Sequence, residues 1–239
     1  MSRIFRNVKE AYAEIERELL EMGLDYQTET YQDQHVGDDP GFLTKELQGY
    51  NFIIEAPDPD DSIKVIQTRD KSIVPWIETE AQERFSGLSH NPGKAWKERP
   101  LVWEQFIEPT SSRFSYTYSE RMYWQLWPII NELKVRPNTR QAVIEIHQSA
   151  LDIFSLGGKR RIPCSLSYSF LIRRHALDCF YVMRSSDYYT HFLNDVVLAI
   201  LLQDFIRHNV NPDLKMGRFH MFVVSLHAFA KDLKARGVF

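Results

Sequence analysis

The sequence predicts a single α+β domain spanning residues 1–239. Three observations lead to this prediction. Helical patterns are interspersed with short strand patterns, residues 165–183 have the alternating form of a β-hairpin, and no repeat, low-complexity tract or linker divides the chain. A length of 239 residues and a hydrophobic content of 44% suit a domain with a sizeable core.

The N-terminal half begins with a well-marked helix. Asn7 is a favourable N-cap, and apolar residues recur at three- and four-residue steps until Gly23, which predicts a helix over residues 8–22. Residues 25–49 are polar and have the composition of an irregular surface loop, either a mobile lid or an insertion. We next expect strands at 51–55 and 62–66 around a turn at 57–61, a helix at 75–85, a loop at 91–109 and a helix at 120–134 containing Pro128.

The C-terminal half is expected to contain most of the sheet. The stretch 195–206 is so continuously apolar that it predicts a buried helix. The expected strands are 142–146, a hairpin of 165–172 and 177–183 joined through 173–175, and an extended aromatic run at 218–229.

Charge and cysteine content exclude several classes of protein. The net charge of −3 and pI of about 6.2 supply no cationic field, which argues against a long nucleic acid as a partner. Two cysteines, Cys164 and Cys179, are too few for a disulfide scaffold, and neither has zinc-site spacing, so we expect no metal. The start lacks a signal-peptide core and the longest apolar run, 196–202, is too short to span a membrane. These features predict a cytoplasmic protein with no membrane partner.

Cys164 is the first candidate for chemistry. It follows Pro163 and three cationic residues, Lys159, Arg160 and Arg161, and nearby positive charge favours the nucleophilic thiolate. The alternative is a buried structural cysteine, because cysteine is among the most buried residue types.

Two further polar groups have competing interpretations. Arg184 and Ser185, directly after a predicted strand, can form a clamp for a phosphate or carboxylate, or Arg184 can pair with Asp187. Asp195 opens the apolar helix, where a carboxylate also serves as an ordinary cap.

The order of these pieces resembles a known family. The chain contains, in sequence, Pro163-Cys164, the hairpin, Arg184-Ser185-Ser186-Asp187, Asn194-Asp195 and Ser225-Leu226-His227-Ala228-Phe229. This order resembles the thymidylate synthase superfamily, and within it most closely the bacteriophage deoxycytidylate hydroxymethylases, over roughly residues 101–232. The resemblance implies a mixed β-sheet packed with helices, with one sheet face used to form a homodimer.

The resemblance also implies catalytic roles. Cys164 corresponds to the nucleophile that adds to C6 of a pyrimidine, so that C5 can attack the one-carbon unit of the folate co-substrate, 5,10-methylenetetrahydrofolate. Glu80 resembles the family's catalytic glutamate and Tyr118 the tyrosine near its proton-transfer network. Asp187 belongs to the same catalytic set, and Trp103 resembles the tryptophan that packs near the folate and C5.

For the nucleotide phosphate, Arg184 and Ser185 match residues of one subunit, and Arg140 resembles the arginine that the other subunit contributes. Gln141 stands where a second arginine is usual. At the sugar, His227 matches the family pattern, whereas Phe229 stands where a tyrosine is common. Deoxyribose and ribose therefore both stay open.

Base choice depends on the position eleven residues after Arg184, where thymidylate synthases have an asparagine that reads uracil. Counting gives Asp195, whose carboxyl group can accept from the N4 amino group of cytosine and, when protonated, donate to N3. A one-residue gap would place Asn194 there and favour uracil.

The sequence thus predicts one-carbon transfer to C5 of a pyrimidine nucleoside monophosphate, with dCMP converted to 5-hydroxymethyl-dCMP. Three alternatives are open. The protein could methylate or hydroxymethylate CMP or dCMP, it could be a thymidylate synthase homologue that uses dUMP, or it could be a non-catalytic regulator that binds a nucleotide.

Overall fold

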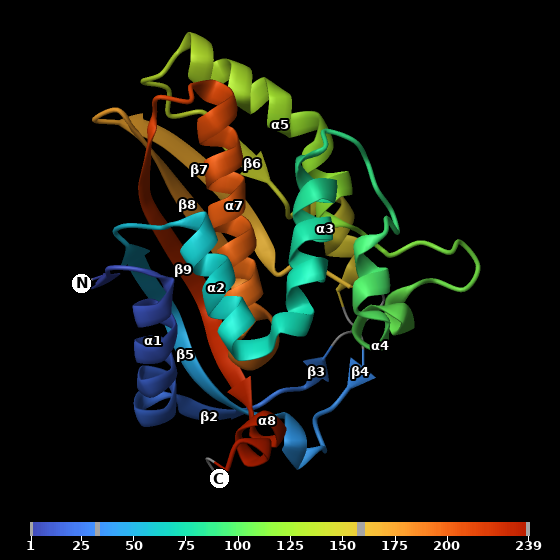
Figure 1. Ribbon diagram of the computed structural model, residues 1–239. Helices are drawn as coiled ribbons and strands as arrows, with labels where there is room; N and C mark the ends of the chain where they lie inside the picture. The colour runs from blue at the N-terminus through green and yellow to red at the C-terminus, as the bar shows by residue number, and fades with distance from the viewer. Residues whose placement is uncertain (1, 32–33, 157–160, 238–239) are drawn as a thin grey trace.

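The computed structural model describes residues 2–31, 34–156 and 161–237 (Figure 1). Lys159 and Arg160, expected to favour the Cys164 thiolate, lie outside the described residues. Within the described part, seven strands form one mixed sheet in the order β1-β5-β9-β8-β7-β6, and β2 pairs with β5. The strands are β1 (Arg3–Phe5), β2 (Leu24–Gln27), β5 (Leu43–Ile54), β6 (Val143–Glu145), β7 (Ser165–Arg173), β8 (Ala176–Asp187) and β9 (Lys215–Phe229).

Strand register brings distant polar residues together. The pairs β1–β5 and β8–β9 are parallel, and the other pairs are antiparallel. Ser185 lies opposite Ser225 and Asp187 opposite His227, so the carboxyl ends of β8 and β9 meet. Glu46 on β5 also lies opposite His227. This corner of the sheet collects polar side chains from three strands.

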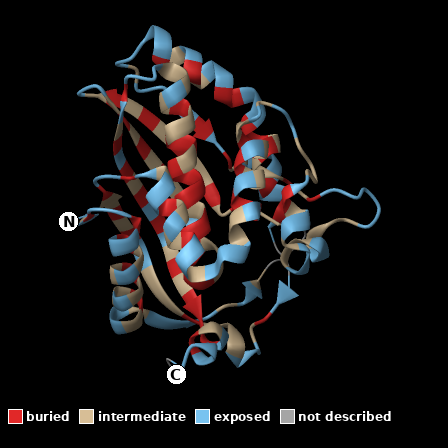
Figure 2. Cartoon of the chain, in the orientation of Figure 1, coloured by how far each residue is buried: buried red, intermediate tan, exposed pale blue. Residues whose placement is uncertain are grey.

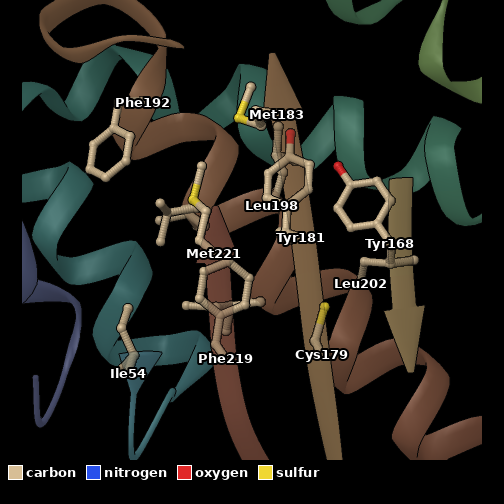
Figure 3. Close-up of a cluster of buried hydrophobic side chains, with 14 of the residues drawn as sticks. Ile54, Tyr168, Cys179, Tyr181, Met183, Phe192, Leu198, Leu202, Phe219 and Met221 are labelled. Atoms are coloured by element: carbon tan, nitrogen blue, oxygen red, sulfur yellow. The ribbon is translucent and has the colours of Figure 1, made fainter. Parts of the chain in front are cut away.

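The long helices pack against the sheet from one side (Figure 1). Figure 2 shows the buried residues along the facing sides of helices and strands. The core between them includes Tyr181, Met183, Phe219 and Met221 from the sheet and Leu198 from a helix (Figure 3). The helices are α1 (Val8–Met22), α2 (Pro59–Asp70), α3 (Val74–Phe85), α5 (Tyr118–Val135) and α7 (Leu193–Val210), with short α4 (Pro100–Trp103), α6 (Ser149–Asp152) and α8 (Ala230–Ala235).

Local signals explain most element boundaries. The side chain of Asn7 accepts a hydrogen bond from the Glu10 amide, and α1 ends before Gly23, as predicted. The predicted helices at 75–85, 120–134 and 195–206 and the predicted hairpin are confirmed with small changes at their ends. The mixed sheet packed with helices confirms the α+β class. No helix in the described ranges is long and apolar enough to cross a membrane.

Three element predictions are wrong. Residues 91–109, predicted to be a loop, contain α4 and short 3-10 helices at Ala95–Glu98 and Glu104–Phe106. Residues 62–66 lie in α2 and not in a strand, because Asp58 caps the helix by accepting from the Asp61 amide and Pro59 occupies its first turn. Residues 25–49 are not an irregular loop. They contain β2, the short strands β3 (Thr30–Tyr31) and β4 (Gln34–His35), and the first half of β5. The polar side chains of β5 conceal its strand pattern because some of them face a cavity and not the core.

Candidate active site

A cavity of about 740 Å³ opens at the carboxyl ends of β8 and β9. Its size is that of a site for a small organic ligand. Helices α3, α5 and α7 and the segment 26–31 complete its wall. Nine residues singled out from the sequence line it together: Glu80, Trp103, Tyr118, Cys164, Arg184, Ser185, Asp187, Asp195 and His227. Two others, Asn194 and the exposed Arg140, are not part of the lining.

Cys164 is accessible from this cavity. It lies one residue before β7, and its carbonyl accepts from the Arg184 amide at 2.8 Å. Its Sγ receives hydrogen bonds from Ser185 Oγ at 3.5 Å and Arg184 Nη2 at 3.7 Å. The other cysteine, Cys179, is fully buried, and burial raises the pKa of its thiol. Of the two cysteines, Cys179 is therefore the one with the burial of a structural cysteine.

Arg184 holds the cysteine segment in place. Its Nε donates to the Pro163 carbonyl at 2.9 Å and its Nη2 to the Ile162 carbonyl at 2.8 Å, while Nη1 reaches Ser185 Oγ at 3.2 Å. The alternative ion pair with Asp187 is not formed among the described residues. Asp187 instead accepts from the amides of Tyr189 and Thr190 and caps the turn that leads into α7.

Glu80 is paired with a buried cation. Its Oε1 lies 2.7 Å from Nε of Arg84, whose side chain is only 5% exposed. The Arg84 guanidinium also lies 3.9 Å from the centre of the Tyr118 ring. Glu80 is therefore fixed on the cavity wall and is not a solvated helix residue. Arg84 is a site residue that was not predicted, although its four-residue spacing from Glu80 on a helix is a recognisable signal.

Asp195 has an environment that favours its protonated form. Burial raises the pKa of its carboxyl to about 7; nearby Glu80 adds to this and the Arg84 cation opposes it. Among the described residues the carboxyl has no hydrogen-bond partner, so it does not act as a helix cap. It lines the cavity and is available to a ligand.

His227 belongs to a small network. Ser225 Oγ donates to Glu46 Oε2 at 2.7 Å and lies 3.3 Å from His227 Nδ1. Burial lowers the pKa of His227, so its imidazole is neutral near pH 7. Glu46 was not predicted as a site residue because it lies in residues 25–49, whose polar composition predicts a loop.

The opposite wall is aromatic. Trp103 stacks on Trp76 with ring centres 6.0 Å apart, and the Arg161 guanidinium lies 5.3 Å from the Trp103 ring. The indole nitrogens of Trp96 and Trp103 are buried without a partner among the described residues, as is Ser186 Oγ. The side chains of Trp76 and Trp103 line the cavity, where a flat ligand can pack against aromatic surface. No group of His, Cys, Asp and Glu in the described residues is arranged to hold a metal.

Comparisons with known proteins agree with this geometry. The family model described as thymidylate synthase matches residues 61–236, which is well over half of the chain. A protein of Methanocaldococcus jannaschii named "Putative thymidylate synthase" is 27% identical over 117 residues, covering 48% of this chain. The aligned part spans about half of that relative, 52% of its length. With a mixed sheet, an accessible cysteine after a proline and an arginine-serine pair beside it, the chain belongs to the thymidylate synthase family.

Proposed function

We propose that this protein transfers a one-carbon unit to C5 of dCMP and forms 5-hydroxymethyl-dCMP. The observation that carries the proposal is the placement of Asp195, with its raised pKa, in the same cavity as Cys164. Asp195 would select the base and Cys164 would attack it. Membership of the thymidylate synthase family supports the reaction class.

Cys164 is the proposed nucleophile. C5 of a pyrimidine is a poor nucleophile until a thiolate adds to C6, which makes C5 enamine-like. The hydrogen bonds from Ser185 and Arg184 to Sγ orient the sulfur within the cavity. A proton must later leave C5, and Glu80 and Tyr118 on the facing wall are the proposed acid–base and hydrogen-bonding groups.

Asp195 is the proposed base selector. A protonated carboxyl can donate to N3 of cytosine while its other oxygen accepts from the N4 amino group. Uracil presents a donor at N3 and an acceptor at position 4, so an ionised carboxylate would face its O4 acceptor to acceptor. Because burial keeps the pKa near 7, the protonated form is substantially populated at neutral pH.

The aromatic wall suits a folate. Methylenetetrahydrofolate would supply the one-carbon unit, and its flat ring system can pack against aromatic side chains of the cavity wall. Stacked Trp76 and Trp103 provide the apolar surface for it.

Arg184, Ser185 and His227 are the proposed contacts to phosphate and sugar within one chain. We further propose a homodimer in which Arg140 reaches the phosphate of the partner's site. Arg140 is exposed and outside its own cavity. On β9, Phe222 and Val224 are 39% and 48% exposed while Met221 and Val223 are buried, so an apolar sheet face opposite the helices is free to pair.

Release of tritium from C5 of labelled dCMP tests the reaction class. The purified protein with methylenetetrahydrofolate is expected to release tritium from dCMP, and Cys164→Ala is expected to stop it. Intact nucleotide binding without any release would instead support a non-catalytic regulator.

A further inference from the structure

A chain of three hydroxyl groups runs from the protein core to the cavity. Ser165 directly follows Cys164, and its Oγ donates a hydrogen bond to the Tyr118 hydroxyl at 3.0 Å. Ser165 Oγ is also hydrogen-bonded to the Tyr181 hydroxyl. Ser165 and Tyr181 are 0% and 1% exposed, whereas Tyr118 lines the cavity. The function proposed above uses Tyr118 but not the two buried groups.

Rigid neighbours hold the inner end of this chain. Tyr181 stacks on Tyr168 of the adjacent strand, with ring centres 4.3 Å apart (Figure 3). A break in the regular pairing of β7 and β8 lies between Ser165 and Ser167, next to the cysteine. Such irregularities re-aim side chains next to active sites. Here the irregularity lies at Ser165, whose hydroxyl is hydrogen-bonded to both Tyr118 and Tyr181.

The hydrogen bonds have a direction. A hydroxyl has one proton to donate. Ser165 donates its proton to Tyr118, so the bond between Ser165 and Tyr181 must use the proton of Tyr181. The Tyr118 oxygen therefore accepts a hydrogen bond from Ser165. The proton of the Tyr118 hydroxyl can then be donated to a different group.

The surroundings of Tyr118 direct that proton into the cavity. The Arg84 guanidinium covers the ring face and offers no acceptor. The Tyr118 hydroxyl is within electrostatic reach of Asp195 and Cys164, both of which line the cavity. Both groups can accept a hydrogen bond, so acceptors for the Tyr118 proton lie on the side where the nucleotide would bind.

We propose that Tyr181 and Ser165 are positioning residues that fix Tyr118 as a hydrogen-bond donor to the nucleotide or to a water molecule held beside its C5. This inference rests on the proposed function. Without the Tyr181 hydroxyl, Ser165 is free to turn and accept from Tyr118, and the donor toward the cavity is lost. The pocket itself would keep its shape, because a phenylalanine preserves the stack on Tyr168.

The test is a double-mutant cycle of Tyr181→Phe and Ser165→Ala, with dCMP turnover and 13C NMR of ζ-labelled tyrosine as readouts. We expect Tyr181→Phe to lower kcat about tenfold and to leave KM for dCMP within about twofold. Because both residues act through one hydroxyl chain, the double variant should show no larger decrease in kcat than Ser165→Ala alone. The Tyr118 ζ-carbon signal, assigned by its loss in Tyr118→Phe, should shift in Tyr181→Phe.

Tyr50→Phe is the matched control. Tyr50 is also buried, and its hydroxyl donates to Glu18 at 3.0 Å, away from the cavity. This variant should keep the wild-type kcat. The inference would be overturned if Tyr181→Phe left kcat unchanged. It would also be overturned if the variant lost kcat and dCMP affinity equally and the effects of the two substitutions were additive in the cycle.

The NMR readout separates the two proposals. If wild-type protein turned over no nucleotide, the proposed function would fail, but a shifted Tyr118 signal in Tyr181→Phe would still support the hydroxyl chain. An unshifted signal would refute the hydroxyl chain whatever the activity.

Discussion

Asp195 and Asn194 are neighbours on α7, yet only Asp195 lines the cavity. Asn194 is buried, and its Nδ2 donates to the Thr190 carbonyl one turn earlier at 3.2 Å. Successive helix residues point about 100° apart, so both cannot face the same ligand. Of the two side chains, the carboxyl is therefore the one on the cavity side, as the proposed base selector must be.

Replacing Asp195 by asparagine should change the preferred base. In the orientation that accepts from N3–H of uracil and donates to O4, the amide faces cytosine acceptor to acceptor at N3 and donor to donor at N4. We expect kcat/KM for dCMP to fall about a hundredfold or more, and dUMP to become the better substrate. Steady-state kinetics with the two nucleotides measure this change.

Asn194→Ala is the control for that substitution. It removes the bond to Thr190 and should lower the free energy of unfolding by about 1 kcal/mol. The preference for dCMP should persist. A switch toward dUMP in this variant, with no switch in Asp195→Asn, would show that the neighbouring residue reads the base.

Binding of dCMP should weaken as the pH rises through about 7. The folded-state pKa of Asp195 is about 7, and above it the carboxyl loses the proton that it would donate to cytosine N3. Calorimetric titrations of dCMP at several pH values measure the effect. Affinity that stays constant, or increases, across this range would contradict the proposed hydrogen bond.

The same shift predicts a trend in stability. An unfolded aspartate loses its proton near pH 3.9, whereas folded Asp195 keeps it until about pH 7. The folded state binds more protons in this window, so Asp195 reduces the free energy of unfolding as pH rises from about 4 to about 7. Denaturant unfolding of Asp195→Asn should lack this contribution.

Cys164→Ala should reduce tritium release from C5 of dCMP by about a thousandfold or more, because it removes the thiol proposed to add to C6. Cys179→Ala is the matched control, since Cys179 is fully buried outside the cavity. That variant should be less stable but still release tritium. Full release by Cys164→Ala would exclude it as the nucleophile.

Asp152→Ala should destabilise the wall of the cavity. Asp152 lies 2.7 Å from Nη2 of Arg121, and the two side chains are 3% and 7% exposed. Removing the carboxylate leaves a buried guanidinium unpaired, at a cost of about 3–5 kcal/mol. Denaturant unfolding measures the loss. Glu21→Ala, which breaks an exposed pair with Arg17, should change little, and an equal effect of the two variants would contradict this account.

Much of the fold could be predicted because its signals are local. The cap at Asn7, the apolar period of α1 and the alternation of β7 and β8 are all visible in short windows. The strand predicted at 62–66 failed because Ile63, Val65 and Ile66 suggested alternation, while the Asp58-Pro59 cap determined a helix.

The candidate site could be predicted from the order of its motifs, but its contacts depend on three-dimensional packing. The pairing of β5 with β9 brings Glu46 to Ser225, residues far apart in sequence. Similarly, which of two adjacent residues faces the cavity depends on where α7 begins, and sequence patterns locate helix ends only to within a residue or two.

The choice of base can be measured in one reaction that contains equimolar dCMP, CMP and dUMP with methylenetetrahydrofolate, with the products analysed by mass spectrometry. We expect dCMP alone to gain the mass of a hydroxymethyl group. Modification of dUMP alone would contradict the assignment of Asp195 as the residue that selects cytosine.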